Sequence, residues 1–272
     1  MERWSDLHIH TKYSDGLFTP GEVITHAKNK GLSCIAITDH DSVQGIDEAM
    51  CAGNGNGIEV IPGVEISAEE NGKEMHILGY YIDYKDKSFL DFLKEIRKDR
   101  VGRCYKMVEA LSERGVNINA KELIESYGDV SISRLHIAHY MAQTGFVKDW
   151  REAFSKYIGD TKPCYVSNFS FSSKEVIDRI KLAKGVSVIA HPGLNRLDYI
   201  LPRLLAEGIQ GIEAYHGKHN EFAKKKYSDF AAENNLVITG GSDCHGRAKG
   251  EMLIGTVKIP YSFVEALQTK RQ

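Results

Sequence analysis

The chain has 272 residues, of which 42% are hydrophobic and 26% are charged, which is enough to bury one large core. A formal net charge of −2 excludes the overall basic field that recruits nucleic acid by bulk electrostatics. The five cysteines lie far apart and form no CxxC pair, so the sequence indicates neither a disulfide framework nor a thiolate zinc site.

The N-terminal ten residues are charged and lack the apolar core of a signal peptide, and no later stretch is long enough to span a bilayer. We therefore expect a cytoplasmic protein that needs no membrane. Short β-rich runs then alternate with helical patterns. Runs such as Cys34–Thr38 and Val186–Ala190 are continuously apolar, which is typical of parallel strands buried on both faces. The predicted strands are Trp4–Ile9, Ser33–Thr38, Glu59–Glu65, His76–Ile82, Val186–Ala190, Gly211–Ala214 and Leu236–Thr239.

The middle of the chain has a different pattern. From Ser88 to Phe171 it is helical, apart from an extended segment at Cys164–Phe171. The predicted helices are Phe89–Arg114, Lys121–Tyr127, Arg134–Thr144 and Trp150–Ile158. Alternating β and α units predict an α/β fold with a parallel sheet that closes, fully or partly, into a barrel. We expect residues 1–87 and 172–272 to form the two parts of that barrel, with 88–171 as a helical insertion over the active-site mouth.

Histidines and carboxylates gather at the ends of the predicted strands. His8 and His10 form an H-x-H pattern at the end of the first strand, where alternate residues point to the same side. His76 is an exception, because it lies near the start of its strand. Strand ends form the rim where barrel enzymes build their sites. The remaining members of the set are Asp15, His40, Glu65, His191, Asp243 and His245.

Each of these residues has an ordinary explanation when it is taken alone. A single strand-end histidine is more often a hydrogen-bonded loop residue, and Glu65 could simply pair with a lysine. Nine such groups at successive strand ends are better explained by shared metal ions. Imidazole and carboxylate ligands without thiolates suit Mn, Zn or Fe rather than a structural zinc site. We therefore expect two or three divalent metal ions.

Six motifs carry a family resemblance: DLHIHTKYSDG, AITDHDS, PGVEIS, HILGY, VIAHPG and GGSDCHG. They resemble the PHP (polymerase and histidinol phosphatase) family from Trp4 to about Gly246. The resemblance implies a distorted (β/α)7 barrel and three metal positions. His8, His10, Glu65 and Asp243 would hold the first ion; Glu65, His76 and His191 the second; Asp15, His40 and His245 the third.

The insertion motifs SISRLHIAH and KPCYV, with IEAYH, further resemble the stand-alone bacterial subgroup that acts on nucleotides. That subgroup includes 3′,5′-nucleotide bisphosphate phosphatases and 5′-to-3′ exoribonucleases of short RNAs. On this basis Arg134, His136 and Lys162 are expected to grip a substrate phosphate, and arginine offers a planar fork for phosphate oxygens. The alternative for Arg134 is an ordinary helix salt bridge.

The expected reaction is metal-dependent hydrolysis of phosphoesters by a metal-bound hydroxide. We expect small nucleotides (3′,5′-bisphosphates) or the 5′ ends of short RNA as substrates, and neither duplex DNA nor an obligate protein partner. Asp243 is expected to take part in catalysis as well as metal binding. His216 follows the strand-end Glu213, and could either protonate the leaving group or orient Asp243.

Three other functions are weighed against this one. The chain could be a phosphatase of another small metabolite, such as histidinol phosphate or a sugar or cyclic phosphate. It could be an amidohydrolase, although the sequence places no obvious lysine between the metal positions for a carbamate bridge. It could also be a non-catalytic PHP accessory module, which the complete ligand set disfavours.

Overall fold

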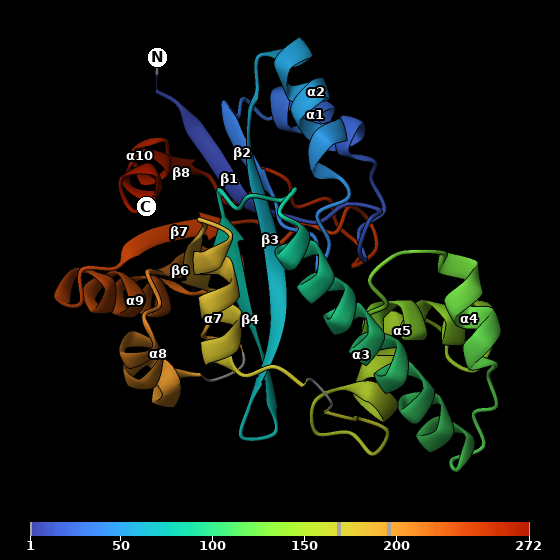
Figure 1. Ribbon diagram of the computed structural model, residues 1–272. Helices are drawn as coiled ribbons and strands as arrows, with labels where there is room; N and C mark the ends of the chain where they lie inside the picture. Colours follow the sequence, from blue (N-terminus) through green and yellow to red (C-terminus); the bar gives the residue numbers. More distant parts are fainter. Residues whose placement is uncertain (1, 168–169, 195–196, 272) are drawn as a thin grey trace.

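The computed structural model describes residues 2–167, 170–194 and 197–271. Its centre is an eight-stranded mixed sheet in the order β7-β6-β5-β4-β3-β2-β1-β8, which nearly closes into a barrel (Figure 1). The predicted α/β barrel architecture is thereby confirmed. The strands are β1 (Trp4–Ile9), β2 (Cys34–Ile37), β3 (Glu59–Glu70), β4 (Lys73–Tyr80), β5 (Val186–Ile189), β6 (Gly211–His216), β7 (Val237–Gly241) and the short β8 (Ile259–Pro260).

At the rim of the nearly closed barrel, β1 contacts the loop after β7. Ile9 forms an isolated parallel bridge with Cys244. The backbone N–H of His10 donates to the Cys244 carbonyl over 2.9 Å. This contact brings the first and last of the predicted ligand-bearing strands side by side.

Two strands depart from the predicted parallel arrangement: the short β8, which was not predicted and pairs antiparallel with β1, and β4. β4 runs antiparallel to both β3 and β5. The reason is a hairpin turn at Asn71 and Gly72, whose φ angles of 52° and 75° are both left-handed. Asn-Gly is the commonest sequence signal for such a turn. As a consequence β3 continues to Glu70. Glu65 therefore lies inside the strand, whereas the sequence had suggested that it ends the strand.

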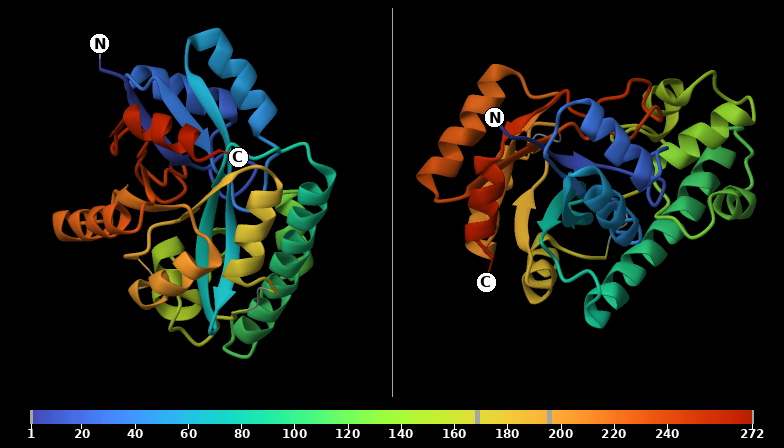
Figure 2. Two further views of the ribbon diagram at one scale, coloured as in Figure 1. Left: turned by 60° about the vertical axis from the view of Figure 1, so that its left-hand side comes forward. Right: turned by 90° about the horizontal axis from the view of Figure 1, so that it is seen from above.

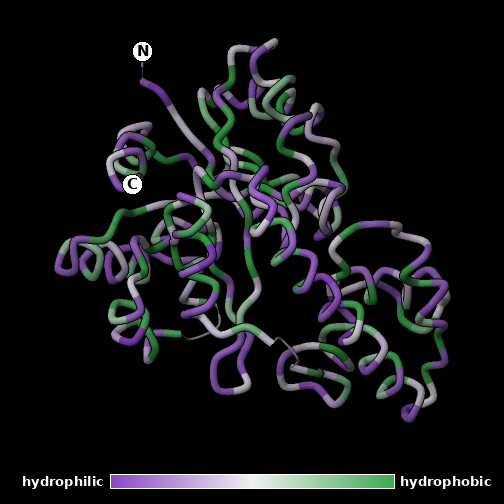
Figure 3. Tube along the Cα trace, in the orientation of Figure 1, coloured by the Kyte–Doolittle hydropathy of each residue, from purple (hydrophilic) through white to green (hydrophobic). Residues whose placement is uncertain are grey.

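Helices cover the outside of the sheet (Figures 1 and 2). The first begins at Pro20 after a capping box, in which the Thr19 hydroxyl accepts from the Glu22 N–H. Inside the barrel, Leu7, Leu78, Tyr80 and Val188 are fully buried. Apolar residues accordingly concentrate on the central strands (Figure 3). These outer helices are α1 (Pro20–Asn29), α2 (Ile46–Asn56), α7 (Ser173–Leu182), the 3-10 turn Asp198–Ile200, α8 (Leu201–Glu207), α9 (Glu221–Glu233) and α10 (Ser262–Thr269).

Between β4 and β5 the chain forms a group of helices with its own apolar core, on the right of Figure 1. Of the extended segment predicted at Cys164–Phe171, residues 168 and 169 lie outside the described residues. Across the parts of the chain that the structure describes, no helix is both long and apolar enough to cross a bilayer. The helices of this group are α3 (Lys87–Ser112), α4 (Ala120–Tyr127), α5 (Arg134–Gln143), α6 (Trp150–Ala153) and a π-helical turn, Phe154–Ile158.

Candidate metal centre

The two histidines of the H-x-H pattern point to one place. Strand alternation puts His8 and His10 on the same side, and both are fully buried. The Nε2 atoms of His8 and His10 each lie 3.3 Å from Oε2 of Glu65. Nε2 of His10 also lies 3.2 Å from Oδ1 of Asp243, on the loop after β7. These four side chains form a first cluster, with all four ligand atoms within 4.8 Å of one another.

Glu65 also belongs to a second group of ligands. Its Oε1 lies 2.9 Å from Nε2 of His191 and 3.0 Å from Nδ1 of His76. Its Oε2 lies 3.1 Å from Nδ1 of His40. Because β4 is antiparallel, His76 lies opposite Ser67 and near the rim, although it is close to the start of its strand. The antiparallel direction therefore explains the one exception in the sequence pattern.

Asp15 is at the centre of a third group. Its Oδ1 lies 3.2 Å from Nε2 of His245, 3.9 Å from Nε2 of His40 and 4.0 Å from Nδ1 of His10. His40 therefore presents one ring nitrogen to Glu65 and the other to Asp15. All nine residues of the predicted ligand set lie together around the rim of the barrel.

The unsatisfied atoms of these clusters test whether metal ions fit. Among the described residues, several buried polar atoms have no hydrogen-bond partner. They include Nε2 of His8 and His10, Nδ1 of His40, His76 and His191, Oδ1 of Asp15 and Oε2 of Glu65. Leaving such atoms unpaired costs free energy, which a shared cation would recover. The buried clusters are thus consistent with a multi-metal site.

Several side chains outside the ligand set hold it in place. Oε1 of Glu74 lies 3.2 Å from Nε2 of His76, and Oε2 of Glu213 accepts the His191 backbone N–H over 2.8 Å. The buried Asp6 accepts the Ser242 N–H over 2.9 Å, next to Asp243. Such partners fix the orientation and tautomer of metal ligands. Nothing in the sequence indicates the roles of Asp6 and Glu74, because their partners are set by the fold.

The site is strongly coupled electrostatically. Burial would raise the pKa of the Glu65 carboxyl, but the rings of His40, His76 and His8 hold that pKa well below its usual range. Burial would lower the pKa of His76, but Glu65 and Glu74 raise that pKa to about 10. The pKa values of His8 and His10 are raised as well, so protons on these three histidines balance the buried carboxylates. A bound metal ion would replace these protons.

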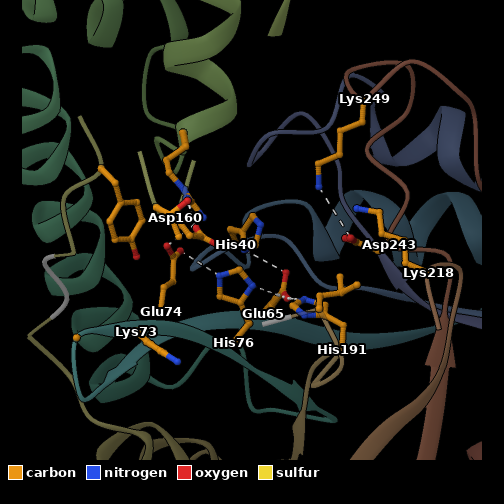
Figure 4. A pocket seen from close by; sticks show the side chains of 15 residues that line it. His40, Glu65, Lys73, Glu74, His76, Asp160, His191, Lys218, Asp243 and Lys249 are labelled. Carbon is orange, nitrogen blue, oxygen red and sulfur yellow. Dashed lines mark hydrogen bonds and ion pairs between the residues drawn. The ribbon is translucent and has the colours of Figure 1, made fainter. Parts of the chain in front are cut away.

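A cavity of about 580 Å³ opens onto the clusters (Figure 4). Among the described residues, its wall carries the cationic side chains of Lys73, Lys218, Lys249 and Arg134. The lysines were not recognised in the sequence, because none belongs to a motif. Nζ of Lys249 lies 3.9 Å from Oδ2 of Asp243. An entering anion would therefore meet positive charge beside the proposed ligands.

Of the three residues expected to bind phosphate, one lines the cavity and two do not. Arg134 lines the cavity, paired with Asp160 and, over 3.4 Å, with Glu74. His136 is buried, and its Nδ1 accepts the Ser133 N–H over 2.9 Å, which caps α5. Lys162 is exposed. Neither His136 nor Lys162 lines the cavity, so the structure gives no support for a phosphate contact by either.

His216 ends β6 and is buried. Its Nε2 lies 3.5 Å from Oδ2 of Asp243, and its Nδ1 accepts the Lys218 N–H over 3.2 Å. This position fits both of the expected roles, proton donor and orienting partner of Asp243.

Comparisons with known proteins agree with this arrangement. Residues 6–169 match the PHP domain. A 3′,5′-nucleoside bisphosphate phosphatase of Chromobacterium violaceum is 36% identical over 258 residues, covering 92% of this chain and 90% of the other. A 5′-3′ exoribonuclease of Haemophilus influenzae is 31% identical over 250 residues, covering 90% and 91%.

Two solved structures share the fold. A candidate metal-dependent phosphoesterase from Bifidobacterium adolescentis has a TM-score of 0.89 and 30% identity, covering 98% of this chain and 96% of that one. A Chromobacterium violaceum structure named as an amidohydrolase, with bound sulfate and no metal, has a TM-score of 0.84 and 33% identity, covering 93% and 90%. The chain therefore belongs to the PHP-domain family and is a metal-dependent phosphoesterase.

Proposed function

We propose that this phosphoesterase acts on small nucleotides, above all 3′,5′-bisphosphates, or on the 5′ ends of short RNA. The observation that carries the proposal is a cavity of nucleotide size with the ligand clusters on its floor and cations on its wall. Its volume of about 580 Å³ is within the usual range of small-molecule sites. The relatives that are a nucleoside bisphosphate phosphatase and an exoribonuclease support the same substrate class.

The nine buried ligands are proposed to hold two or three Mn, Zn or Fe ions. Bound ions of this kind lower the pKa of water toward neutrality and neutralise phosphoryl oxygens. Glu65 faces the first cluster with one carboxylate oxygen and His76 and His191 with the other, so it is proposed to serve both positions. His216, beside Asp243, is placed to hold a proton near the leaving oxygen or to orient the aspartate.

The chain's own cations are proposed to bind the substrate phosphates. Arg134 lines the cavity and offers a planar fork, and Lys73, Lys218 and Lys249 add positive charge around the opening. Tyr165 also lines the cavity, with the Arg134 guanidinium 5.2 Å from its ring centre. Residues 88–171, which supply Arg134 and Tyr165, are proposed to act as one unit that covers the mouth of the site.

The experiment is a substrate screen with manganese-loaded protein. It compares adenosine 3′,5′-bisphosphate, a 5′-phosphorylated oligoribonucleotide, histidinol phosphate, sugar and cyclic phosphates and an aryl phosphate, with a panel of amides and lactones. We expect the highest kcat/KM on the bisphosphate or the oligoribonucleotide. A preference for histidinol phosphate or a cyclic phosphate would overturn the substrate assignment, and hydrolysis of amides alone would overturn the proposal as a whole.

A further inference from the structure

The longest helix, α3, changes character along its buried face. Phe92, Leu93 and Ile96 pack into the core between the sheet and the outer helices. Farther along, Cys104, Met107, Val108 and Leu111 pack into the separate core of the helical insertion. Between these two apolar stretches lie Arg100 and Arg103, which are only 3% and 4% exposed. Spaced three residues apart, they share one face of the helix.

Arg100 is bound to the turn that carries His40. Its Nε pairs with the carboxylate of Asp41, and its Nη2 donates to the Ser67 hydroxyl over 2.7 Å. The Asp41 carboxylate also accepts the Ser67 backbone N–H over 2.8 Å. The Asp41 N–H in turn donates to the carbonyl of Glu65 over 2.9 Å. Arg100 thus ties the residue after His40 to the stretch of β3 that carries Glu65.

Arg103 is linked through Glu74 to His76, another ligand that faces Glu65. Its Nη2 donates to Oε2 of Glu74 over 2.9 Å, and its Nε donates to the Val166 carbonyl over 2.7 Å. The other oxygen of Glu74 lies 3.2 Å from Nε2 of His76. This contact leaves Nδ1 of His76 facing Glu65 over 3.0 Å. Arg103 therefore acts on His76 through a single carboxylate.

Stability alone does not explain these arginines. Burying a charge removes its hydration, and a buried ion pair is often no more stable than apolar residues of similar volume. An apolar face on both sides of Arg100 and Arg103 would be continued most simply by further apolar residues. The contacts of both arginines instead lead to the cluster of His40, Glu65 and His76.

We propose that Arg100 and Arg103 are positioning residues for the second group of ligands, in which Glu65 faces His40, His76 and His191, so that the insertion is part of the metal site as well as its cover. This inference rests on the proposed metal site but not on the substrate. In the first cluster His8 is supported from the barrel instead, because its Nδ1 lies 2.9 Å from Oε1 of Glu213 on β6.

The test measures metal binding rather than activity. Mn²⁺ is titrated by calorimetry into metal-stripped wild type, Arg100→Met, Arg103→Met and the control Arg179→Met. Arg179, on α7, is a matched control. Its guanidinium packs on Phe92 of α3, 5.3 Å from the ring centre, and it contacts no proposed ligand in the described structure. We expect the dissociation constant of one Mn²⁺ equivalent to rise at least about 10-fold in both α3 variants, as for other partners of metal ligands. The other equivalents and the control should keep the wild-type affinity.

Unchanged Mn²⁺ affinity in either α3 variant, or an equal loss in Arg179→Met, would overturn the inference. Melting curves will show whether the variants fold. If a methionine variant does not fold, Arg100→Lys and Arg103→Lys replace it. The lysine variants keep the charge, but one ammonium group cannot contact both Glu74 and Val166 as the guanidinium of Arg103 does. Wild-type Mn²⁺ affinity in the lysine variants would therefore overturn the inference too. Wild-type protein that binds no Mn²⁺ would overturn the metal proposal itself.

Discussion

Oε1 of Glu213 lies 2.9 Å from Nδ1 of His8, and both side chains are fully buried. With a metal ion bound, a proton on Nδ1 would remain in this hydrogen bond, and the lone pair of Nε2 would be free for the ion beside Glu65 and Asp243. A carboxylate behind a histidine in this way makes the ring a better ligand. Glu213 is thus expected to act on metal binding without contacting an ion.

The first prediction is that Glu213→Gln weakens metal binding. The amide keeps the size of the side chain but removes the charge that supports His8, so we expect metal affinity to fall about 10- to 100-fold. The weakened position should be the cluster of His8, His10 and Asp243, which distinguishes this variant from those in α3. Calorimetric titration with Mn²⁺ measures the effect. Wild-type affinity in Glu213→Gln would show that the hydrogen bond is merely structural.

The ligands of the metal cluster could be predicted from the sequence because a local pattern places each of them at or near a strand end, although they are far apart in the chain. The alternation of His8 and His10 along β1 is a property of any strand. The remaining ligands follow strands or lie on them, and strand ends gather at one rim. The direction of β4 was also encoded locally, in the turn at Asn71 and Gly72, but the alternating β and α pattern led to a parallel assignment that is wrong.

The supporting contacts could not be predicted from the sequence. Arg100 and Asp41 are 59 residues apart, and Glu213 and His8 are 205 residues apart. Nothing in the neighbourhood of either pair indicates the partner. His136 shows the same limit, because its place in an insertion motif suggested substrate binding, whereas the contact that the fold gives its ring is a cap of α5. A histidine can either bind substrate or cap a helix, and only tertiary packing decides between these two roles.

The second prediction concerns metal removal. Because the ligand atoms of His8, His10, His40 and Glu65 are buried without hydrogen-bond partners in the described structure, bound ions should stabilise the folded state. A metal present at 100 times its dissociation constant adds about 2.7 kcal/mol. We expect Mn²⁺ to raise the melting temperature, chelation to reverse the rise, and Glu65→Gln to reduce it strongly. Scanning calorimetry measures this, and equal melting temperatures with and without Mn²⁺ would contradict the metal site.

The third prediction separates Arg134 from Lys162. Arg134 lines the cavity, so Arg134→Ala should lower kcat/KM on adenosine 3′,5′-bisphosphate by about 10- to 100-fold, the usual effect of losing a charged hydrogen bond. The loss on an aryl phosphate should be smaller. Lys162 is exposed and does not line the cavity, so Lys162→Ala should match wild type on both substrates.

Two controls accompany the Arg134 variant. Its metal content must be measured, because Arg134 also pairs with Glu74, the partner of His76. Steady-state kinetics with metal-replete protein then reports on the substrate alone. Equal losses on the bisphosphate and the aryl phosphate would argue against a phosphate contact by Arg134.

The fourth prediction concerns the pH dependence of stability. Burial lowers the pKa of His136 from its ordinary 6.5 to about 4. As pH falls, the unfolded chain therefore binds the proton before the folded protein does. The stability associated with neutral His136 is complete above pH 6.5 and is lost progressively between pH 6.5 and about 4. The difference between the two pKa values corresponds to about 3 kcal/mol of unfolding free energy at most.

His136→Gln tests this directly, because glutamine can occupy the same position in a capping box but does not titrate. Urea unfolding of the metal-free proteins between pH 7.5 and 4.5 gives the unfolding free energies. We expect the wild-type value to decrease more steeply than that of the variant below pH 6.5, with parallel curves above it. Parallel curves across the whole range would mean that His136 does not titrate differently in the folded and unfolded states, and that its burial carries no pH-dependent cost.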